Sequence, residues 1–137
     1  HGLHDTVRVT GWLGYEDVFE ELKKCDVGLI TFTENYNNRM AGPPNKLFNY
    51  MASGLPVISV NYPELKFIVE TAVNGYVISS DQKELEALLG EIASNRTILK
   101  ELSENGLKAF DESYSWEHQA FKLNSAYSSL LDRVGEI

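Results

Sequence analysis

The residue types best suited to chemistry lie between Arg39 and Lys46, where a glycine-containing loop runs into a predicted helix. The N-terminus of a helix presents unpaired backbone N–H groups and about half a positive charge, and both attract phosphate. Arg39 and Lys46 add two positive charges that can form strong hydrogen bonds to phosphate oxygens. The segment therefore predicts a diphosphate site, although a surface loop whose cations offset an acidic chain would have the same local sequence.

Metal and thiol chemistry are not expected. His1 and His4 lie at one end of the chain, and His118 falls on the polar side of the last predicted helix, so shared metal ligation is not predicted. No Asp-x-Asp pair occurs in the sequence. The one cysteine, Cys25, falls on the apolar stripe of a predicted helix and is expected to be a small core residue. We therefore predict no metal, no cofactor and no internal disulfide.

Short apolar runs and helical periodicity predict the elements that must position the loop. The apolar runs predict strands at 7–10, 26–32, 56–60 and 76–79. Apolar residues three and four positions apart predict helices at 15–25 and 45–54, a short helix through Leu65 and Val69, and helices beginning near Asp81, Asn95 and Ser115. Strands that alternate with helices predict an α/β fold, a Rossmann-like parallel sheet with helices on both faces.

The carboxyl edge of such a sheet is where its ligands bind. The loops at 11–14, 33–44 and 61–64 should gather there. The loop at 33–44 is longer than a plain connection in a compact domain, which favours a binding role. The strand at 26–32 is nearly continuous in apolar character and is expected to be buried on both faces.

A few residues are predicted to start or stop the helices. Asn45 can cap the helix that follows the long loop, and Gly54 is placed to stop it in the left-handed conformation. Asn74-Gly75 is expected to end the next helix. Asp81 with Glu84 predicts a capping box for the helix after that one.

The last predicted helix carries a sustained apolar stripe. Its members alternate at four and three positions and are Trp116, Ala120, Leu123, Tyr127, Leu130 and Val134. An apolar stripe needs a partner surface. The helix therefore either packs on its own domain or reaches toward a neighbouring domain.

Composition limits the class of protein. The chain has 137 residues, 43% of them hydrophobic, which fits one globular domain with its own core. A formal net charge of -8 has the wrong sign for binding a phosphate backbone, so no nucleic-acid partner is expected. No apolar run approaches the ~18 residues that span a bilayer, which limits membrane contact to a peripheral one. A single cysteine fits a reducing cytoplasm.

The stretch from Pro44 to Ser59 carries a family resemblance. It reads PNKLFNYMASGLPVIS and is followed by Tyr62-Pro63 and Asn74-Gly75. This pattern resembles the donor-binding domain of the group 1 retaining glycosyltransferases that use nucleotide sugars, where P-x-K-L-F-E-Y-M-A-x-G-x-P-V-I is typical. Those enzymes have the GT-B architecture of two Rossmann-like domains. The runs at 7–11, 25–27 and 114–116 resemble weaker motifs of the same domain, so the similarity spans nearly the whole chain.

The resemblance implies a nucleotide diphosphate-sugar as donor substrate and no separate cofactor. The implied donor contacts are Gly11, Trp12 and Leu13 for the base, Asn49 for the ribose, and Arg39, Ala41, Gly42, Asn45 and Lys46 for the diphosphate. It also implies glycosyl transfer to an acceptor hydroxyl with retention of the anomeric configuration. The helix dipole and the cations would let the nucleoside diphosphate leave without a metal.

The same resemblance implies the setting of the reaction. The acceptor, a sugar or a lipid-linked sugar, would bind a separate N-terminal domain. Surface polysaccharide assembly is the expected process. The expected location is the cytoplasm or the inner face of the membrane, where the full-length protein could make peripheral contact.

Two positions depart from the family pattern. Asn49 and Phe67 stand where the family has glutamates. Asparagine offers a ribose one acceptor oxygen, whereas phenylalanine cannot accept a hydrogen bond at all. An upstream glutamate found in a related form of the motif would fall on Ala41, and Glu64 and Glu70 lie near enough in sequence to substitute. Two alternatives to an active transferase follow: a nucleotide-sugar binding module without catalysis, and a sugar-nucleotide epimerase of the same architecture.

The domain is expected to be incomplete on its N-terminal side. A strand-like run is already under way by Val7, and a complete domain of the family opens with two more strands that would precede His1. Those strands would lie between the strands at 7–10 and 26–32, and without them sheet edges are exposed. We interpret residues 1–137 as a partial C-terminal nucleotide-sugar-binding domain whose terminal helix, at 113–137, can reach toward the missing domain. A second copy could fill the gap, so self-association is a further expectation.

Overall fold

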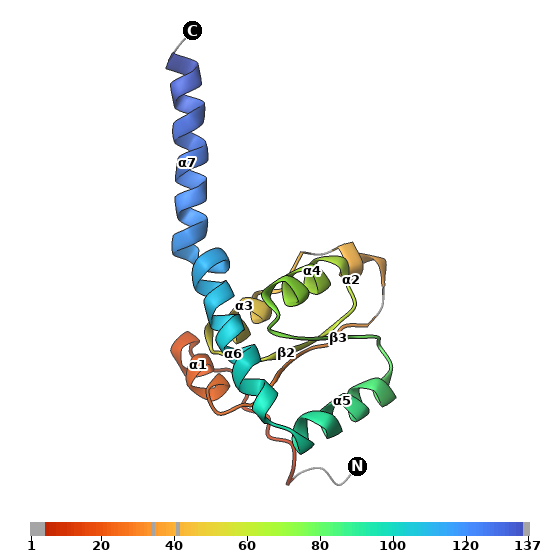
Figure 1. The fold of residues 1–137 in the computed structure, drawn as a ribbon. Coiled ribbons are helices and arrows are strands. Elements are labelled where there is room, and N and C mark those ends of the chain that lie inside the picture. Colours follow the sequence, from red (N-terminus) through yellow and green to blue (C-terminus); the bar gives the residue numbers. More distant parts are fainter. Residues whose placement is uncertain (1–4, 34, 41, 136–137) are drawn as a thin grey trace.

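The computed structural model of this chain describes residues 5–33, 35–40 and 42–135, and in these ranges three parallel strands form one sheet (Figure 1). The strands lie side by side in the order β1 (Gly28–Ile30), β2 (Val57–Val60) and β3 (Gly75–Ile78). Both neighbouring pairs are parallel. The predicted α/β class with a parallel sheet is confirmed.

Helices lie on both faces of the sheet, as predicted (Figure 1). α3 (Asn45–Ala52) and α4 (Pro63–Ala72) pack on one face, and α5 (Gln82–Ser94) packs on the other. The remaining elements are α1 (Tyr15–Leu22), α2 (Tyr36–Met40), α6 (Thr97–Ala109), the π-helical turn η1 (Phe110–Tyr114) and α7 (Trp116–Gly135). The short α2 forms inside the segment at 33–44, where the sequence predicted only a loop.

The sheet separates two hydrophobic clusters. The larger cluster packs α3 and α4 on the strands and includes Ile30 and Met51, while the smaller packs α5 on Ile58 and Ile78. Leu29 is the register partner of Ile58 but is 41% exposed. It lies on the outer strand of the described sheet, and α5 packs mainly on side chains of β2 and β3. The prediction that this strand is buried on both faces was therefore wrong.

Two predictions about the first 25 residues are also wrong. The segment at 7–10 forms no strand, and Val7 and Val9 are 58% and 87% exposed. A strand needs a neighbour for its backbone hydrogen bonds, and in the described ranges β1 pairs with β2 alone. Cys25 is exposed and not a core residue, because α1 ends at Leu22 and buries none of its side chains.

The helix ends confirm some predicted caps and correct others. At α3, Pro44 has the extended backbone of an N-cap residue and Asn45 is already helical, so the first turn has no side-chain cap. Gly54 follows α3 with a φ of 68°, as predicted. Asp81 caps α5 by accepting a hydrogen bond at 2.8 Å from an N–H of the first turn. Glu84 instead accepts a hydrogen bond at 2.7 Å from the backbone N–H just beyond β3, so the predicted capping box does not form.

The end of α4 holds the least favourable backbone conformation among the described residues other than glycine. Val73 has a φ of 48°, in the left-handed region, whereas the sequence placed the helix stop at Asn74-Gly75. Side-chain crowding makes this region costly for a β-branched residue. The carbonyl of Val73 accepts a hydrogen bond at 3.1 Å from the Asn105 side chain, which holds the turn in place.

Replacing Val73 with glycine should therefore stabilise the fold. The substitution removes a left-handed strain of about 1 to 2 kcal/mol and adds a glycine entropy cost of about 0.5 to 1 kcal/mol. The Val73 side chain is 56% exposed, so little burial is lost. We expect the free energy of unfolding in urea to rise by about 0.5 to 1 kcal/mol. A decrease would mean that the valine side chain contributes more to packing than its exposure indicates.

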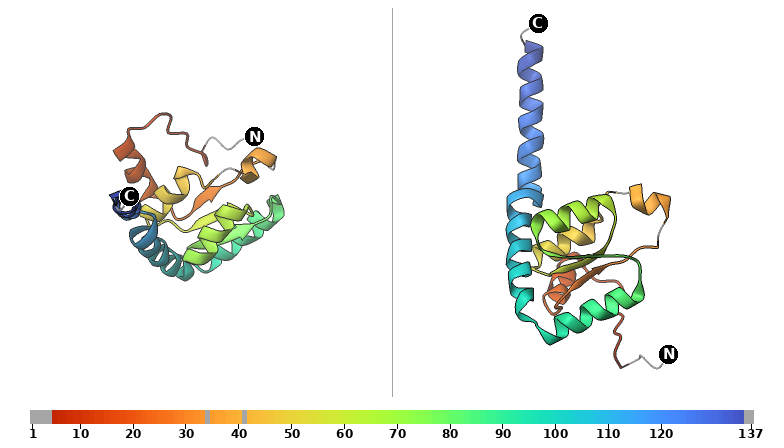
Figure 2. Two further views of the ribbon diagram at one scale, coloured as in Figure 1. Left: turned by 90° about the horizontal axis from the view of Figure 1, so that it is seen from above. Right: turned by 45° about the vertical axis from the view of Figure 1, so that its right-hand side comes forward.

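α7 extends away from the rest of the molecule (Figures 1 and 2). The Ser115 hydroxyl accepts a hydrogen bond from the His118 N–H at 3.3 Å, which confirms the predicted helix start. Large apolar side chains of α7 are more than half exposed and include Trp116, Phe121, Leu123, Tyr127, Leu130 and Leu131. The interpretation that this stripe packs on its own domain is therefore wrong. No helix in the described ranges is both long and apolar enough to cross a membrane.

Candidate functional site

Two cavities lie where the strands end at the carboxyl edge of the sheet. The first has a volume of about 270 Å³ and is lined by Phe32, Asn38, Gly42, Pro44, Tyr62 and Leu65. The second, of about 240 Å³, lies toward α5 and is lined by residues at or just beyond the carboxyl ends of the three strands. Phe32 lines both cavities. This edge is where open parallel sheets bind their ligands.

The first cavity lies between the N-termini of two helices. Its wall includes Pro44 and Tyr62, the N-cap residues of α3 and α4, and neither helix has a side-chain cap. The second helix is the weaker anion site, because Pro63 has no N–H and Glu64 puts a carboxylate in the first turn. α3 has no acidic residue in its first turn. The positive end of α3 is therefore the stronger attraction for an anion in this cavity.

The Lys46 side chain brings a full positive charge to Phe32, in the wall that the two cavities share. Its Nζ lies 4.7 Å from the centre of the Phe32 ring, a cation–π contact. Phe32 in turn stacks on Tyr62, with ring centres 6.5 Å apart and an angle of 5° between the ring planes. The Tyr62 hydroxyl donates a hydrogen bond to the Thr33 carbonyl at 3.1 Å. The three side chains thus form one stack beside the first cavity.

Most of the predicted diphosphate residues gather at this edge. Gly42 lines the first cavity, and Asn45 and Lys46 form the first turn of α3. Asn49, the predicted ribose residue, lies one turn further along the same helix and is partly buried. Arg39 belongs to α2.

Ala41 lies outside the described residues.

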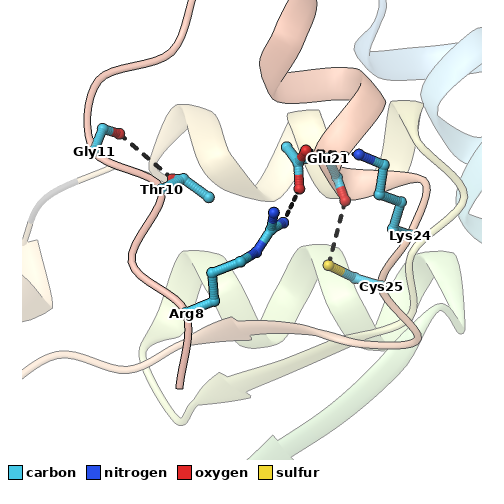
Figure 3. Close-up of polar contacts among 6 residues, drawn as sticks. All are labelled: Arg8, Thr10, Gly11, Glu21, Lys24 and Cys25. Atoms are coloured by element: carbon cyan, nitrogen blue, oxygen red, sulfur yellow. Dashed lines mark hydrogen bonds and ion pairs between the residues drawn. The ribbon is translucent and has the colours of Figure 1, made fainter. Parts of the chain in front are cut away.

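The residues predicted to hold the base lie elsewhere. Gly11, Trp12 and Leu13 precede α1 and line neither of the two cavities. Trp12 is fully exposed, and Gly11 has a φ of 71°. Figure 3 shows the residues just before them, where the Arg8 guanidinium is paired to the Glu21 carboxylate of α1. Hydrogen bonds from Lys24 and Arg8 lower the pKa of Glu21. The structure therefore does not bring the predicted base contacts to the diphosphate residues.

Of the two positions that depart from the family pattern, Asn49 is partly buried and Phe67 is exposed. Phe67 is 64% exposed on α4, and Glu64 and Glu70 are exposed as well.

Tyr36, in α2, is 75% exposed. In the described ranges, no three His, Cys, Asp or Glu side chains gather as a metal ion would require.

The sequence analysis missed Phe32, Tyr62 and Leu65 as residues of the first cavity. A signal for two of them was present, since Phe32 and Tyr62 are the first aromatic residues after β1 and β2. The loops that follow neighbouring parallel strands meet at one edge, so these rings could be expected to lie close together.

Comparison with known proteins decides the family. The family described as "Glycosyl transferases group 1" matches residues 1–95. This chain belongs to the group 1 glycosyltransferases. The match covers the sheet, both cavities and the Lys46 stack, so these features belong to a group 1 domain.

Individual relatives have named roles in glycan synthesis. A chitobiosyldiphosphodolichol beta-mannosyltransferase of Kluyveromyces lactis is 32% identical over 108 residues, which is 77% of this chain and 23% of that protein. The enzyme of that name from Eremothecium gossypii is 32% identical over 119 residues, or 87% of this chain and 23% of the relative. The amylovoran biosynthesis glycosyltransferase AmsK of Erwinia amylovora is 30% identical over 88 residues, covering 64% of this chain and 22% of AmsK. The chain thus spans less than a quarter of the length of these group 1 relatives.

Proposed function

We propose that the protein carrying this chain transfers a glycosyl group from a nucleotide diphosphate-sugar to an acceptor hydroxyl, and that this chain binds the donor. Membership of the group 1 family supports glycosyl transfer as the reaction. One observation from the structure carries the assignment of the donor site. The uncapped N-terminus of α3 opens on a cavity at the carboxyl edge, beside the Lys46 ammonium.

The chemistry of the leaving group fits this arrangement. The acceptor hydroxyl oxygen bonds to the anomeric carbon and its proton passes to the departing diphosphate oxygen, while the bond between that oxygen and the anomeric carbon breaks. Negative charge develops on the nucleoside diphosphate as it leaves. The Asn45 and Lys46 N–H groups and the Lys46 ammonium would stabilise that charge. They are fixed before the reaction by α3 and by the Phe32 ring. Asn49, one turn along, would hydrogen-bond the ribose through its carboxamide.

The rest of the protein would supply the acceptor. In our proposal this chain is the C-terminal, donor-binding domain, and the exposed stripe of α7 packs on a domain that binds a sugar or lipid-linked sugar. The name of the chitobiosyldiphosphodolichol mannosyltransferases supports a lipid-linked sugar as acceptor, and the name of AmsK, an amylovoran biosynthesis glycosyltransferase, supports a role in polysaccharide synthesis. We place the reaction in surface polysaccharide assembly, at the cytoplasmic side of the membrane.

A nucleotide-sugar binding module without catalysis is the second candidate. It is favoured by Asn49 and Phe67, which replace two glutamates of the family pattern. An assay of the full-length protein with labelled nucleotide sugars separates the candidates. Glycosyl transfer supports the first proposal, binding without turnover supports the second, and epimerised nucleotide sugar in the absence of acceptor would support neither. The anomeric configuration of the product tests retention.

Restoring the two carboxylates tests whether their loss limits the reaction. In the full-length protein, Asn49→Glu combined with Phe67→Glu should raise turnover at saturating donor by about tenfold, while donor affinity changes less. The restored groups would act mainly in the transition state, which affects turnover more than binding. Phe67 is 64% exposed, so a glutamate there is compatible with folding.

The matched control is Asn49→Gln combined with Phe67→Gln, which has similar side-chain volume but no charge. It should leave turnover near the wild-type value. If the glutamate variant is folded and no faster than a wild type that already transfers sugar, then Asn49 and Phe67 are tolerated variation and the case for a non-catalytic module is lost.

A further inference from the structure

The Lys46 side chain by itself is too flexible to hold its ammonium group at a fixed position. A lysine side chain has four rotatable bonds and loses much conformational entropy when it is ordered. A phosphate site at the N-terminus of α3 needs the ammonium in one place before the ligand arrives. A neighbouring group that restricts the Lys46 side chain would therefore strengthen phosphate binding.

The Phe32 ring is placed to do this. The Lys46 Nζ lies 4.7 Å from its centre, within the range of a cation–π contact. Phe32 is itself fixed, because it lies two residues beyond the end of β1, packs against the larger hydrophobic cluster and stacks on Tyr62. Tyr62 is 5% exposed and is tied to the Thr33 carbonyl by its hydroxyl. The position of the ammonium is thus set by the core through two aromatic rings.

We propose that Phe32 is a positioning residue that holds the Lys46 ammonium beside the first cavity and so sets the affinity for a diphosphate. This inference rests on the proposed donor site. Phe32 also lines both cavities, so a purely structural role as cavity wall is the competing explanation. The two explanations differ in one respect: positioning acts through Lys46, whereas a wall acts without it.

A double-mutant cycle in the full-length protein separates them. The probes are UDP, GDP, ADP and CDP, and the nucleoside diphosphate that binds most tightly is carried forward with its parent nucleoside. Phe32→Leu should weaken diphosphate binding about two- to fivefold in the wild-type background, the loss expected for one cation–π contact. In a Lys46→Met background the same change should have no further effect. Binding of the uncharged nucleoside should be unaffected by Phe32→Leu.

Two further variants test whether the effect of Phe32→Leu comes from loss of the aromatic ring at this position. Phe32→Tyr keeps an aromatic ring and should restore diphosphate affinity. Phe48→Leu is the matched control, because Phe48 lies on the same helix as Lys46 and packs against the same hydrophobic cluster as Phe32. The Phe48 ring instead packs on the Tyr114 ring, with ring centres 5.5 Å apart. It should change stability without changing diphosphate affinity.

The results for Lys46→Met and Phe32→Leu distinguish failure of the donor site from failure of the positioning role. If Lys46→Met itself leaves diphosphate binding unchanged, the donor site proposed at α3 fails and this inference falls with it. If Lys46→Met weakens binding but Phe32→Leu weakens it equally in both backgrounds, the donor site stands and the positioning role is overturned. A measurement on the unaltered protein covers the case of an unstable variant. The ε-CH₂ protons of Lys46 should be shifted upfield by the Phe32 ring current, and an unshifted resonance would overturn the proposal.

Discussion

Replacing Gly75 with alanine is expected to lower the free energy of unfolding by about 3 kcal/mol or more, the upper range for overpacking. A Cβ added at Gly75 would lie 1.9 Å from the backbone carbonyl oxygen of Val57, its partner on β2. The obstacle is backbone, so no side-chain rotation can relieve it. β3 would have to move away from β2, which would break the ladder at the centre of the described sheet.

The matched control is Gly90→Ala on α5. A Cβ there meets nothing within 4 Å, and alanine is the better helix former by about 1 kcal/mol. Urea unfolding should therefore show opposite signs for the two glycine-to-alanine changes. A Gly75→Ala variant as stable as the wild type would contradict the close approach of Gly75 to the Val57 carbonyl.

Replacing Lys46 with alanine should weaken nucleoside diphosphate binding by the full-length protein by about 1 to 3 kcal/mol, the range for a charge-assisted hydrogen bond. The side chain is partly buried against Phe32, so its charge acts where water is partly excluded. Calorimetric titration of a nucleoside diphosphate into the two proteins measures the difference. Salt should reduce this loss only modestly, because the contact is short-ranged.

The control for charge alone is Lys100→Ala. Lys100 lies on α6, with its side chain 83% exposed and near Glu104. Both variants change the net charge of the chain from -8 to -9, so any difference between them reports position and not total charge. Equal losses in the two variants would remove Lys46 from the site.

The sequence predicted the parts of the fold that depend on local patterns. The run from Asn45 to Ile78 yielded α3, β2, α4 and β3 because apolar spacing and Gly54 act within each segment. Errors arose where a distant partner decides the outcome. The segment at 7–10 has the alternation of a strand but no neighbour to pair with in the described ranges. Leu29 is exposed because α5 packs mainly on side chains of β2 and β3.

The candidate site shows the same division. The loop that includes Gly42 and the first turn of α3 could be predicted, because phosphate affinity at a helix start is a local property. The contact of Lys46 with Phe32 could not, since 14 positions separate the two residues and only the sheet brings them together. The N-cap of α3 was predicted one residue too late. The sequence pattern indicated Asn45, but Pro44 takes that position and leaves the first turn without a side-chain cap.

The proposed donor site is tested most directly at the backbone N–H groups at the start of α3. In full-length protein labelled with ¹⁵N in asparagine and lysine, saturation with the nucleoside diphosphate that binds most tightly should shift the Asn45 and Lys46 amide protons downfield, as expected for hydrogen bonds to phosphate. Lys83, whose N–H at the start of α5 is already bonded to Asp81 at 2.8 Å, serves as the internal control and should not move. A diphosphate that binds the protein while the Asn45 and Lys46 resonances stay in place would contradict the donor site proposed here.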